Sequence, residues 1–224
     1  LRDKNDKTKY FDNDEMWEKA ENELRKVLTE LGLPFYEAEG EAAFYGPKLD
    51  VQVKSAIGHD VTLSTCQLDF LLPERFELTY VDENGEKVRP VVIHRAILGS
   101  LDRFIAFLLE ETKGNLPTWL APTQVIVMPV NNEYHLDYSS EIYNSLLENN
   151  IRVELDCRDE KLSYRLRESQ NRKIPYTLIL GDKERDSKEI SFRKFGSQET
   201  TTMSKDEFVK LIKQIIETKK APAA

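Results

Sequence analysis

The sequence has few of the residues that cross-link a chain or anchor it in a membrane. Its 224 residues include only two cysteines, Cys66 and Cys157, and their wide separation fits neither a metal-binding nor a redox motif. No apolar run approaches the roughly 20 residues that a membrane helix needs. The charged start of the chain also lacks the apolar core of a signal peptide. These absences predict free thiols and a cytosolic protein.

An excess of positive charge is also missing. The formal net charge is -8, which argues against broad electrostatic binding of nucleic acid, because such binding depends on displacing counterions with a basic surface. Any contact with nucleic acid must therefore be local. Neither a G-x-G-x-x-G pattern nor a glycine-lysine phosphate loop occurs in the second half of the chain, so a dinucleotide site and a P-loop have little support there.

The first half of the chain has the pattern of a helix followed by a sheet. Apolar residues at helical spacing predict a helix over residues 14–31, capped by Asp12 or Asn13 and ended by Gly32. We expect strands at residues 49–53, 61–70, 76–81 and 87–94. An Asn-Gly pair at residues 84–85 is a strong hairpin signal, so the sheet is predicted to be antiparallel.

The pattern changes after the prolines at residues 117 and 122, and we expect domains at residues 1–117 and 118–224. Beyond this boundary strands and helices alternate, which predicts parallel strands joined by crossover helices. The expected elements are strands at 124–130, 151–156 and 176–180, helices at 138–149 and 162–172, an edge strand at 189–194 and a closing helix at 204–218. The fold class is α/β, with a mixed sheet flanked by helices in the second domain.

The residues from 91 to 111 predict a buried strand that passes through Gly99 into an amphipathic helix. Its apolar stripe is expected to pack against the core and consists of Phe104, Ile105, Leu108 and Leu109. Ser100 and Arg103 lie in the first turn, where free backbone N–H groups and the helix dipole already favour an anion. The alternative is that Arg103 is a surface residue paired with Asp102 or Glu110.

Polar residues share one face of the strand at residues 61–70, which often indicates a lined pocket. They are Thr65, Gln67 and Asp69. The alternative for Gln67 is a cross-strand amide, and Tyr45 by itself is typical of packing. His94, one of three histidines, ends a strand with no second metal ligand nearby in the sequence, a setting more typical of a hydrogen-bonded histidine.

A group of cations stands out between residues 158 and 173 of this acidic chain. It contains Arg158, Lys161, Arg165, Arg167, Arg172 and Lys173. One interpretation is a solvated helix with pairs such as Glu168 to Arg172. The other is a local site for a polyanion, where Glu184 and Arg193 could contact bases, since a carboxylate accepts from amino groups and arginine forks onto guanine.

Several motifs together resemble the class II aminoacyl-tRNA synthetases, and among them the threonyl-tRNA synthetases. Gly-Ser-Leu-Asp-Arg-Phe at residues 99–104 is similar to motif 3 of the class, and Ile-His-Arg-Ala-Ile-Leu at 93–98 is similar to the threonyl enzymes. Phe-Tyr-Gly-Pro-Lys at 44–48, Gln-Leu-Asp-Phe at 67–70 and Gly-Asp-Lys-Glu at 181–184 match in the same order. The resemblance implies part of a class II catalytic domain followed by an anticodon-binding domain.

The resemblance also implies roles for individual residues. Arg103 and Gln67 would be catalytic, and ATP, used with Mg²⁺, would contact Arg103, Gln67, Ser100 and Thr65. Tyr45 and Lys48 would bind L-threonine, and His94 would be one of three protein ligands of a Zn²⁺ ion that selects threonine by its hydroxyl. In the second domain, Asp159, Arg167, Glu184 and Arg193 would contact the tRNA anticodon.

The implied function is that of a threonine-tRNA ligase, acting as a homodimer on tRNA(Thr). The chain begins at Leu1 without an initiator methionine, and we expect motifs 1 and 2 and the other zinc ligands to lie upstream of it. It departs from the family pattern at Thr62, Asp102 and Asp159, and the last of these is one of the implied anticodon contacts. The chain alone is therefore expected to be inactive. The alternative function is a non-catalytic tRNA-binding module.

Overall fold

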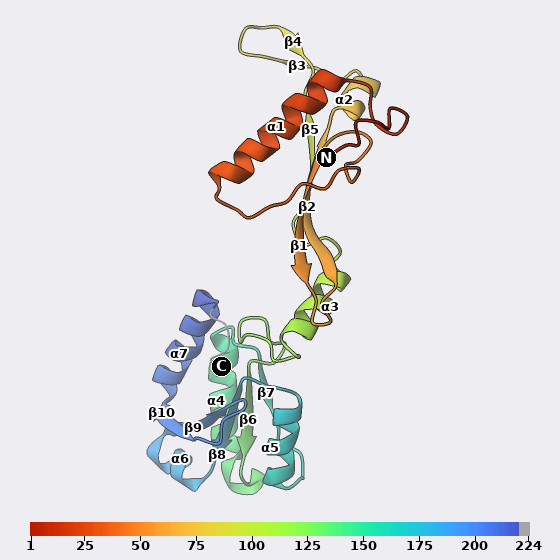
Figure 1. Ribbon diagram of the computed structural model, residues 1–224. Helices are drawn as coiled ribbons and strands as arrows, with labels where there is room; N and C mark the ends of the chain where they lie inside the picture. Colours follow the sequence, from red (N-terminus) through yellow and green to blue (C-terminus); the bar gives the residue numbers. More distant parts are fainter. Residues whose placement is uncertain (220–224) are drawn as a thin grey trace. The chain divides into compact units, whose positions relative to one another are not determined.

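The computed structural model describes residues 1–219 and divides the chain into two compact units, Leu1–Leu108 and Leu109–Ala224 (Figure 1). Each unit is described by itself. The frayed tail expected at residues 219–224 lies, except for Lys219, outside the described residues. In the described part of the chain, no helix combines the length and the apolar character needed to cross a membrane.

The first unit opens with helix α1, Asp14–Glu30, as the sequence predicts. The side chain of Asn13 caps it by accepting from the N–H of Met16 at 3.0 Å. Trp17 is buried against Tyr10, with ring centroids 5.6 Å apart, and its indole N–H donates to the carbonyl of Phe11 at 2.8 Å. One buried tryptophan thus fixes the helix to the segment that precedes it.

An antiparallel sheet of order β1-β2-β5 forms the centre of this unit, which confirms the predicted strand direction. Its strands are β1 Lys48–Lys54, β2 Asp60–Asp69 and β5 Val92–Ala96. The predicted hairpin is present, but its strands, β3 Tyr80–Val81 and β4 Lys87–Val88, form a separate two-stranded sheet. Gly85 supplies the positive φ of +81° that the hairpin turn requires.

Two of the predicted strands in this unit are wrong in extent. The strand expected at residues 76–81 is reduced to β3, because a short helix, α2 Leu71–Arg75, precedes it and is begun by the Asp69 carboxylate. The strand expected at residues 87–94 is broken between β4 and β5. Pro90 lies in the break, where a residue without an N–H cannot donate to a strand ladder.

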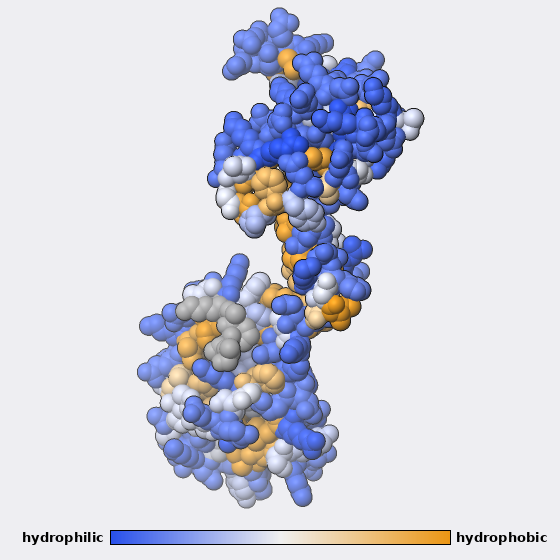
Figure 2. All heavy atoms as spheres, in the orientation of Figure 1, coloured by the Kyte–Doolittle hydropathy of each residue, from blue (hydrophilic) through white to orange (hydrophobic). Residues whose placement is uncertain are grey.

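The stretch from β5 into helix α3, Leu101–Glu111, has the predicted order of elements but not the predicted burial. Strand β5 alternates between half-buried and exposed residues, and none of the residues of α3 is buried. Ile105 and Leu109, on the apolar stripe, are 44% and 45% exposed, and Figure 2 shows apolar surface over this helix. Amphipathic periodicity indicates that a face favours burial, but it cannot indicate what covers that face.

The second unit is a five-stranded mixed sheet of order β10-β9-β8-β6-β7 between helices. Its strands are β6 Val125–Pro129, β7 Val153–Leu155, β8 Tyr176–Leu180, β9 Glu189–Lys194 and β10 Thr201–Ser204. Its helices are α4 Asn132–Glu148, α5 Leu162–Asn171, α6 Asp182–Ser187 and α7 Lys205–Thr218. Strand β6 pairs in parallel with β7 and β8, as the alternating pattern predicts.

The core of the second unit lies mainly between the sheet and two helices. Side chains of α4 and α7, including Ile142 and Phe208, pack against Val127 and Leu178 of the sheet. Helix α5 covers the other face, where Leu166 packs beside Ile126 and Met128. The result is a layer of helix on each side of the sheet (Figure 1).

Three details of the second unit differ from the sequence prediction. Helix α4 begins at Asn132 rather than at residue 138, because the side chain of Asn131 caps it. The short helix α6 was not expected. Strand β9 is not an edge strand, since β10 pairs with it and forms the edge. Helix α7 starts as predicted, with Ser204 and Glu207 in a capping box.

Candidate functional sites

One face of the β1-β2-β5 sheet carries most of the polar residues that the sequence singled out. Lys48, Gln67 and His94 are register partners across the three strands, and Asp50 pairs with Thr65 in an adjacent row. Residues two positions apart in a strand face the same side. The sequence prediction that Thr65 and Gln67 share one face is therefore confirmed, and the sheet adds residues from both neighbouring strands to it.

Hydrogen bonds link these side chains into a connected set. The Tyr45 hydroxyl donates to Oε1 of Gln67. The Thr65 hydroxyl donates to Oδ1 of Asp50 at 2.6 Å, while Nζ of Lys48 lies 2.8 Å from Oδ2 of the same carboxylate. Asp50 thus holds two predicted site residues at once. It was missed in the sequence, although its position two residues after Lys48 in a strand indicates the same face.

Tyr45 reaches this face because Gly46 permits a very close approach of two backbones. A Cβ atom at Gly46 would lie 2.0 Å from the carbonyl oxygen of Leu68. On either side of Gly46, the N–H of Leu68 donates to the carbonyl of Pro47 at 3.0 Å and that of Phe70 donates to the carbonyl of Tyr45 at 3.1 Å. The loop carrying Tyr45 is therefore seated directly against β2.

His94 contacts Asp69 and Tyr45 rather than lying in an apolar core. Its Nε2 lies 2.8 Å from Oδ2 of Asp69, and its ring centroid is 5.6 Å from that of Tyr45. Its side chain is 42% exposed. Within residues 1–219, no three His, Cys, Asp or Glu side chains are grouped as metal ligands. One imidazole does not form a tetrahedral zinc site, so the described residues do not fit zinc by themselves.

The amino end of α3 lies beside the start of β2. Gly99 has a φ of +61°, and a Cβ atom there would be 3.1 Å from the carbonyl oxygen of Leu63. The Ser100 hydroxyl accepts from the N–H of Arg103 at 3.3 Å and caps the first turn. Arg103 is exposed, and the described residues contain no ion pair between it and Asp102 or Glu110. Its guanidinium is therefore available to an anion.

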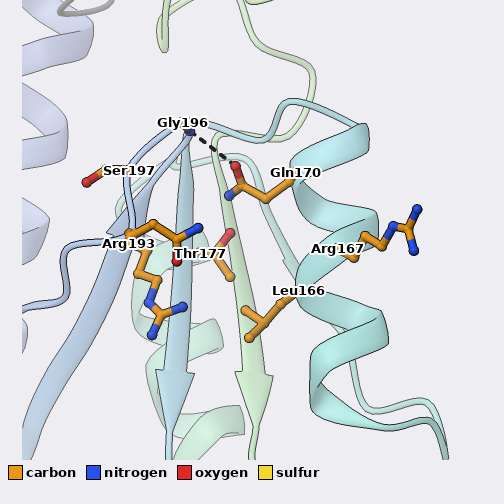
Figure 3. A pocket seen from close by; sticks show the side chains of 8 residues that line it. Leu166, Arg167, Gln170, Thr177, Arg193, Gly196 and Ser197 are labelled. Carbon is orange, nitrogen blue, oxygen red and sulfur yellow. Dashed lines mark hydrogen bonds between the residues drawn. The ribbon is translucent and has the colours of Figure 1, made fainter.

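The second unit contains a pocket of about 300 Å³ between α5 and β9 (Figure 3). Two of the predicted anticodon residues, Arg167 and Arg193, line it, although the guanidinium of Arg167 points away from the pocket. Nε of Arg193 donates to the Thr200 hydroxyl at 3.0 Å, which leaves its terminal nitrogens for other partners. Gln170 and Thr177 also line the pocket and were not singled out in the sequence.

The other two predicted anticodon residues lie elsewhere in this unit. Asp159 is exposed and does not line the pocket. Glu184 accepts from the hydroxyl of Ser191 at 2.6 Å and from the N–H of Gly181 at 2.9 Å. Burial raises the pKa of the Glu184 carboxyl, but these two hydrogen bonds, a backbone hydrogen bond at Glu184 and the charge of Lys183 together leave the pKa below its ordinary value. Glu184 is therefore an ionised cap of α6.

The cationic group at residues 158–173 is largely structural. Arg165 is buried and donates to the backbone carbonyls of Asp156 and Pro129 at 2.7 and 2.8 Å. The predicted Glu168 to Arg172 pair is wrong, because Glu168 pairs with Arg158 at 2.6 Å and Arg172 pairs with Glu154 at 2.7 Å. Among the described residues, Arg167 of this cationic group forms no ion pair.

Comparison with known families first defines the class of protein. Residues 3–112 match the tRNA synthetase class II core domain (G, H, P, S and T), and residues 124–215 match the anticodon binding domain. The polar sheet face with the helix that begins near it lies in the first match, and the pocket lies in the second. The chain thus combines a class II synthetase core region with an anticodon-binding domain.

Individual relatives narrow this class to one family. The chain is 57% identical over 219 residues to the threonine-tRNA ligase of Geobacillus kaustophilus and 56% identical over 219 residues to that of Oceanobacillus iheyensis. The chain belongs to the threonyl-tRNA synthetase family. Each match covers 98% of this chain and 34% of the relative, so the chain spans about a third of their length.

A solved structure gives the same result. The RNA binding domain of threonyl-tRNA synthetase from Cryptosporidium parvum superposes with a TM-score of 0.85 and is 33% identical in sequence. The match covers 93% of this chain and 52% of that one. The order of elements in both units is therefore shared with a threonyl-tRNA synthetase.

Proposed function

We propose that the protein carrying this chain is a threonine-tRNA ligase, which joins L-threonine to tRNA(Thr) at the expense of ATP. The observation that carries the proposal is the polar face of the β1-β2-β5 sheet together with Arg103 on α3, whose amino end approaches β2 at Gly99. In this proposal, residues 1–117 belong to the catalytic domain and residues 118–224 form the anticodon-binding domain, as predicted from the sequence.

The chemistry requires positioning more than covalent help from the protein. In the first step, a carboxylate oxygen of threonine attacks the α-phosphorus of ATP, forming threonyl-adenylate and releasing pyrophosphate. In the second step, a ribose hydroxyl of the tRNA attacks the carbonyl carbon of the adenylate and releases AMP. Tyr45 and Lys48 would hold threonine, Thr65, Gln67 and Ser100 would contact ATP, and Arg103 would stabilise the phosphate charge.

Zinc, Mg²⁺ and a homodimer belong to this proposal as well. His94 would supply one imidazole to a zinc site, with Asp69 orienting its ring, as carboxylates commonly do for metal-bound histidine. Zinc would supply a Lewis acid for the hydroxyl of threonine. Since His94 is the one zinc ligand that the described residues offer here, no step is assigned to the metal. We expect the 224-residue chain by itself to bind tRNA without activating threonine.

Threonine-dependent exchange of pyrophosphate into ATP tests the proposal. The protein expressed from the full reading frame that contains this chain should catalyse exchange with threonine and should reject valine. Arg103→Ala should lower the rate by about 100-fold, the order of one lost charge-stabilising contact. Arg89→Ala, which removes an exposed pair with Glu74, is the matched control. Binding of tRNA without any exchange would instead support a non-catalytic tRNA-binding module.

A further inference from the structure

A side-chain hydrogen bond joins the two walls of the pocket in the second unit. Oε1 of Gln170, on α5, accepts from the backbone N–H of Gly196 at 3.1 Å, and Figure 3 shows this bond across one end of the pocket. Gly196 lies in the turn between β9 and β10 and has a φ of +76°, a conformation that favours glycine. Gln170 therefore holds a turn whose backbone conformation at residue 196 favours glycine.

Backbone hydrogen bonds support the turn from the sheet side. The N–H of Phe195 donates to the carbonyl of Pro175 at 2.9 Å, and the N–H of Ser197 donates to that of Lys194 at 3.1 Å. The bond from Gly196 to Gln170 ties the same turn to the helix on the opposite wall. This wall, which includes Ser197 and Gln198, is thus tied to α5 through the side chain of Gln170.

The orientation of the Gln170 amide is fixed by this bond. Because the oxygen accepts from Gly196, the NH₂ group is directed elsewhere, and Figure 3 shows the side chain beside that of Thr177 inside the pocket. The NH₂ group forms no hydrogen bond with any residue in the range 1–219. Thr177 itself is buried and its hydroxyl donates to Ser169 at 3.2 Å. Gln170 thus presents two unused donors to the pocket.

The described lining offers donors and no negative charge. Arg193 supplies the terminal nitrogens of its guanidinium, Gln170 supplies its amide, and Leu166 forms an apolar wall. None of the lining residues in the described part of the chain is acidic. Such a lining suits a base edge that carries acceptors. Uracil carries a carbonyl oxygen at C4 and guanine carries one at C6, whereas cytosine and adenine carry at these positions amino groups that need acceptors.

From this geometry we infer that Gln170 determines base specificity in the pocket, an inference that rests on the proposed RNA-binding function of the second unit. The carbonyl of Gln170 holds the Gly196 turn, and its NH₂ group donates a hydrogen bond to O4 of a uracil or O6 of a guanine that lies against Leu166. The pocket accordingly selects keto bases over amino bases. Gln170 has two roles, one in positioning the wall and one in reading the base.

Two substitutions separate these roles. Gln170→Glu keeps an oxygen for the Gly196 N–H but replaces the donor with an acceptor, whereas Gln170→Met removes both bonds at similar length. Asn171→Ala is the matched control, since Asn171 is the exposed neighbour on α5 and does not line the pocket. Hydrogen exchange of the Gly196 amide, followed by NMR, should be slow in the wild-type chain and in Gln170→Glu, and fast in Gln170→Met.

Binding is measured with the 224-residue chain and fluorescent RNA hairpins. One hairpin carries a threonine anticodon, and two others replace its uracil by cytosine or its guanine by adenine. The wild-type chain should prefer the first hairpin. Gln170→Met should reduce the preference for the threonine hairpin over one of the two altered hairpins by roughly 3- to 10-fold, the worth of one neutral hydrogen bond. Gln170→Glu should reduce it further, because a carboxylate accepts from the amino base.

The ratio between hairpins is the deciding measurement. If Gln170→Met and Gln170→Glu weaken all hairpins by the same factor, or change nothing, then Gln170 is only structural and the inference is overturned. If the wild-type chain binds no hairpin better than an unrelated one, the proposed RNA-binding function itself fails, an outcome visible before any variant is made. Should Gln170→Met unfold, Gln170→Glu still decides, because it retains the bond to Gly196.

Discussion

The carboxylate of Asp69 both holds the ring of His94 and starts helix α2. Its Oδ2 lies 2.8 Å from Nε2 of His94, and its Oδ1 accepts from the N–H groups of Leu71 and Leu72 at 2.9 and 3.0 Å. Asp69 is only 1% exposed, so water cannot replace these partners. The orientation of His94 is thus coupled to the fold of the chain that follows β2.

Substitution of Asp69 should therefore destabilise the first unit. In Asp69→Asn the amide oxygen can still cap α2, but the hydrogen bond to His94 is altered, and we expect a loss of about 1–2 kcal/mol in the free energy of unfolding. Asp69→Ala should lose more, because the buried N–H groups then have no side-chain partner. Urea unfolding followed by Trp17 fluorescence in a Trp119→Phe background reports on this unit alone.

Asp60→Asn provides the comparison for this measurement. It removes an exposed ion pair with Lys54, at 2.9 Å, and should change the free energy of unfolding by less than about 0.5 kcal/mol. Equal stability of the Asp69→Asn variant and the wild-type chain would show that the contact with His94 contributes nothing to the fold.

Gly46→Ala should displace Tyr45 from the polar sheet face. A Cβ atom at this position would lie 2.0 Å from the backbone oxygen of Leu68, so one of the two backbones must move. Overpacking of this kind costs about 1–3 kcal/mol, and the hydrogen bond from Tyr45 to Gln67 should be lost with it. The same urea unfolding gives the first effect, and the NMR signals of the Gln67 side-chain amide report the second.

Gly40→Ala is the control for the glycine substitution. Gly40 has a φ of +83°, but a Cβ atom there would meet nothing within 4 Å, so alanine introduces backbone strain without a clash. The Gln67 signals should remain unchanged in Gly40→Ala. If both variants leave the Gln67 amide in its wild-type environment, the close approach at Gly46 is not what seats Tyr45.

Local chemistry in the sequence predicts most of the elements of this fold. The Asn13 cap, the Ser204 capping box and the shared face of Thr65 and Gln67 each depend on residues a few positions apart, which a sequence displays directly. Helix α6 was missed because Asp182–Ser187 has no apolar periodicity and begins through Glu184 folding back onto Gly181. Strand β10 is short and polar, so it carries little strand signal.

Contacts between distant segments could not be read in the same way. The register that places His94 opposite Gln67 depends on how the chain returns after the break at Pro90, and the contact between His94 and Asp69 follows from that register. Pocket residues such as Gln170 and Thr177 come from different elements and have ordinary sequence surroundings. That they line one pocket becomes evident only when α5 is packed beside the sheet.

The stability of the second unit should fall on acidification, partly because of Glu184. Hydrogen bonds from Ser191 and Gly181 hold the pKa of this carboxyl below its ordinary value despite burial. A lowered folded-state pKa contributes stability that is fully present above the unfolded pKa, about 4.3, and is lost as the pH falls through the folded pKa. Glu184→Gln should therefore be less stable than the wild-type chain at pH 7, and this difference should shrink between pH 5 and pH 3.

Trp119 fluorescence in a Trp17→Phe background follows the urea unfolding of the second unit. Glu199→Gln, at an exposed position between β9 and β10, is the control and should show little difference from the wild-type chain at any pH. A wild-type advantage over Glu184→Gln that stays constant from pH 7 to pH 3 would contradict the role given to the Glu184 hydrogen bonds.

Arg193→Ala should weaken binding of a threonine anticodon hairpin by about 1–3 kcal/mol, the usual worth of a forked base contact. The Arg193 side chain lines the pocket and is held there by Thr200, so its position is defined before RNA binds. Lys194→Ala, at the exposed next position of β9, should cost less and should affect all hairpins alike, as loss of a phosphate contact does. Fluorescence anisotropy with threonine and unrelated hairpins separates the two cases. An equal loss across hairpins for Arg193→Ala would mean that Arg193 contacts phosphate and does not read a base.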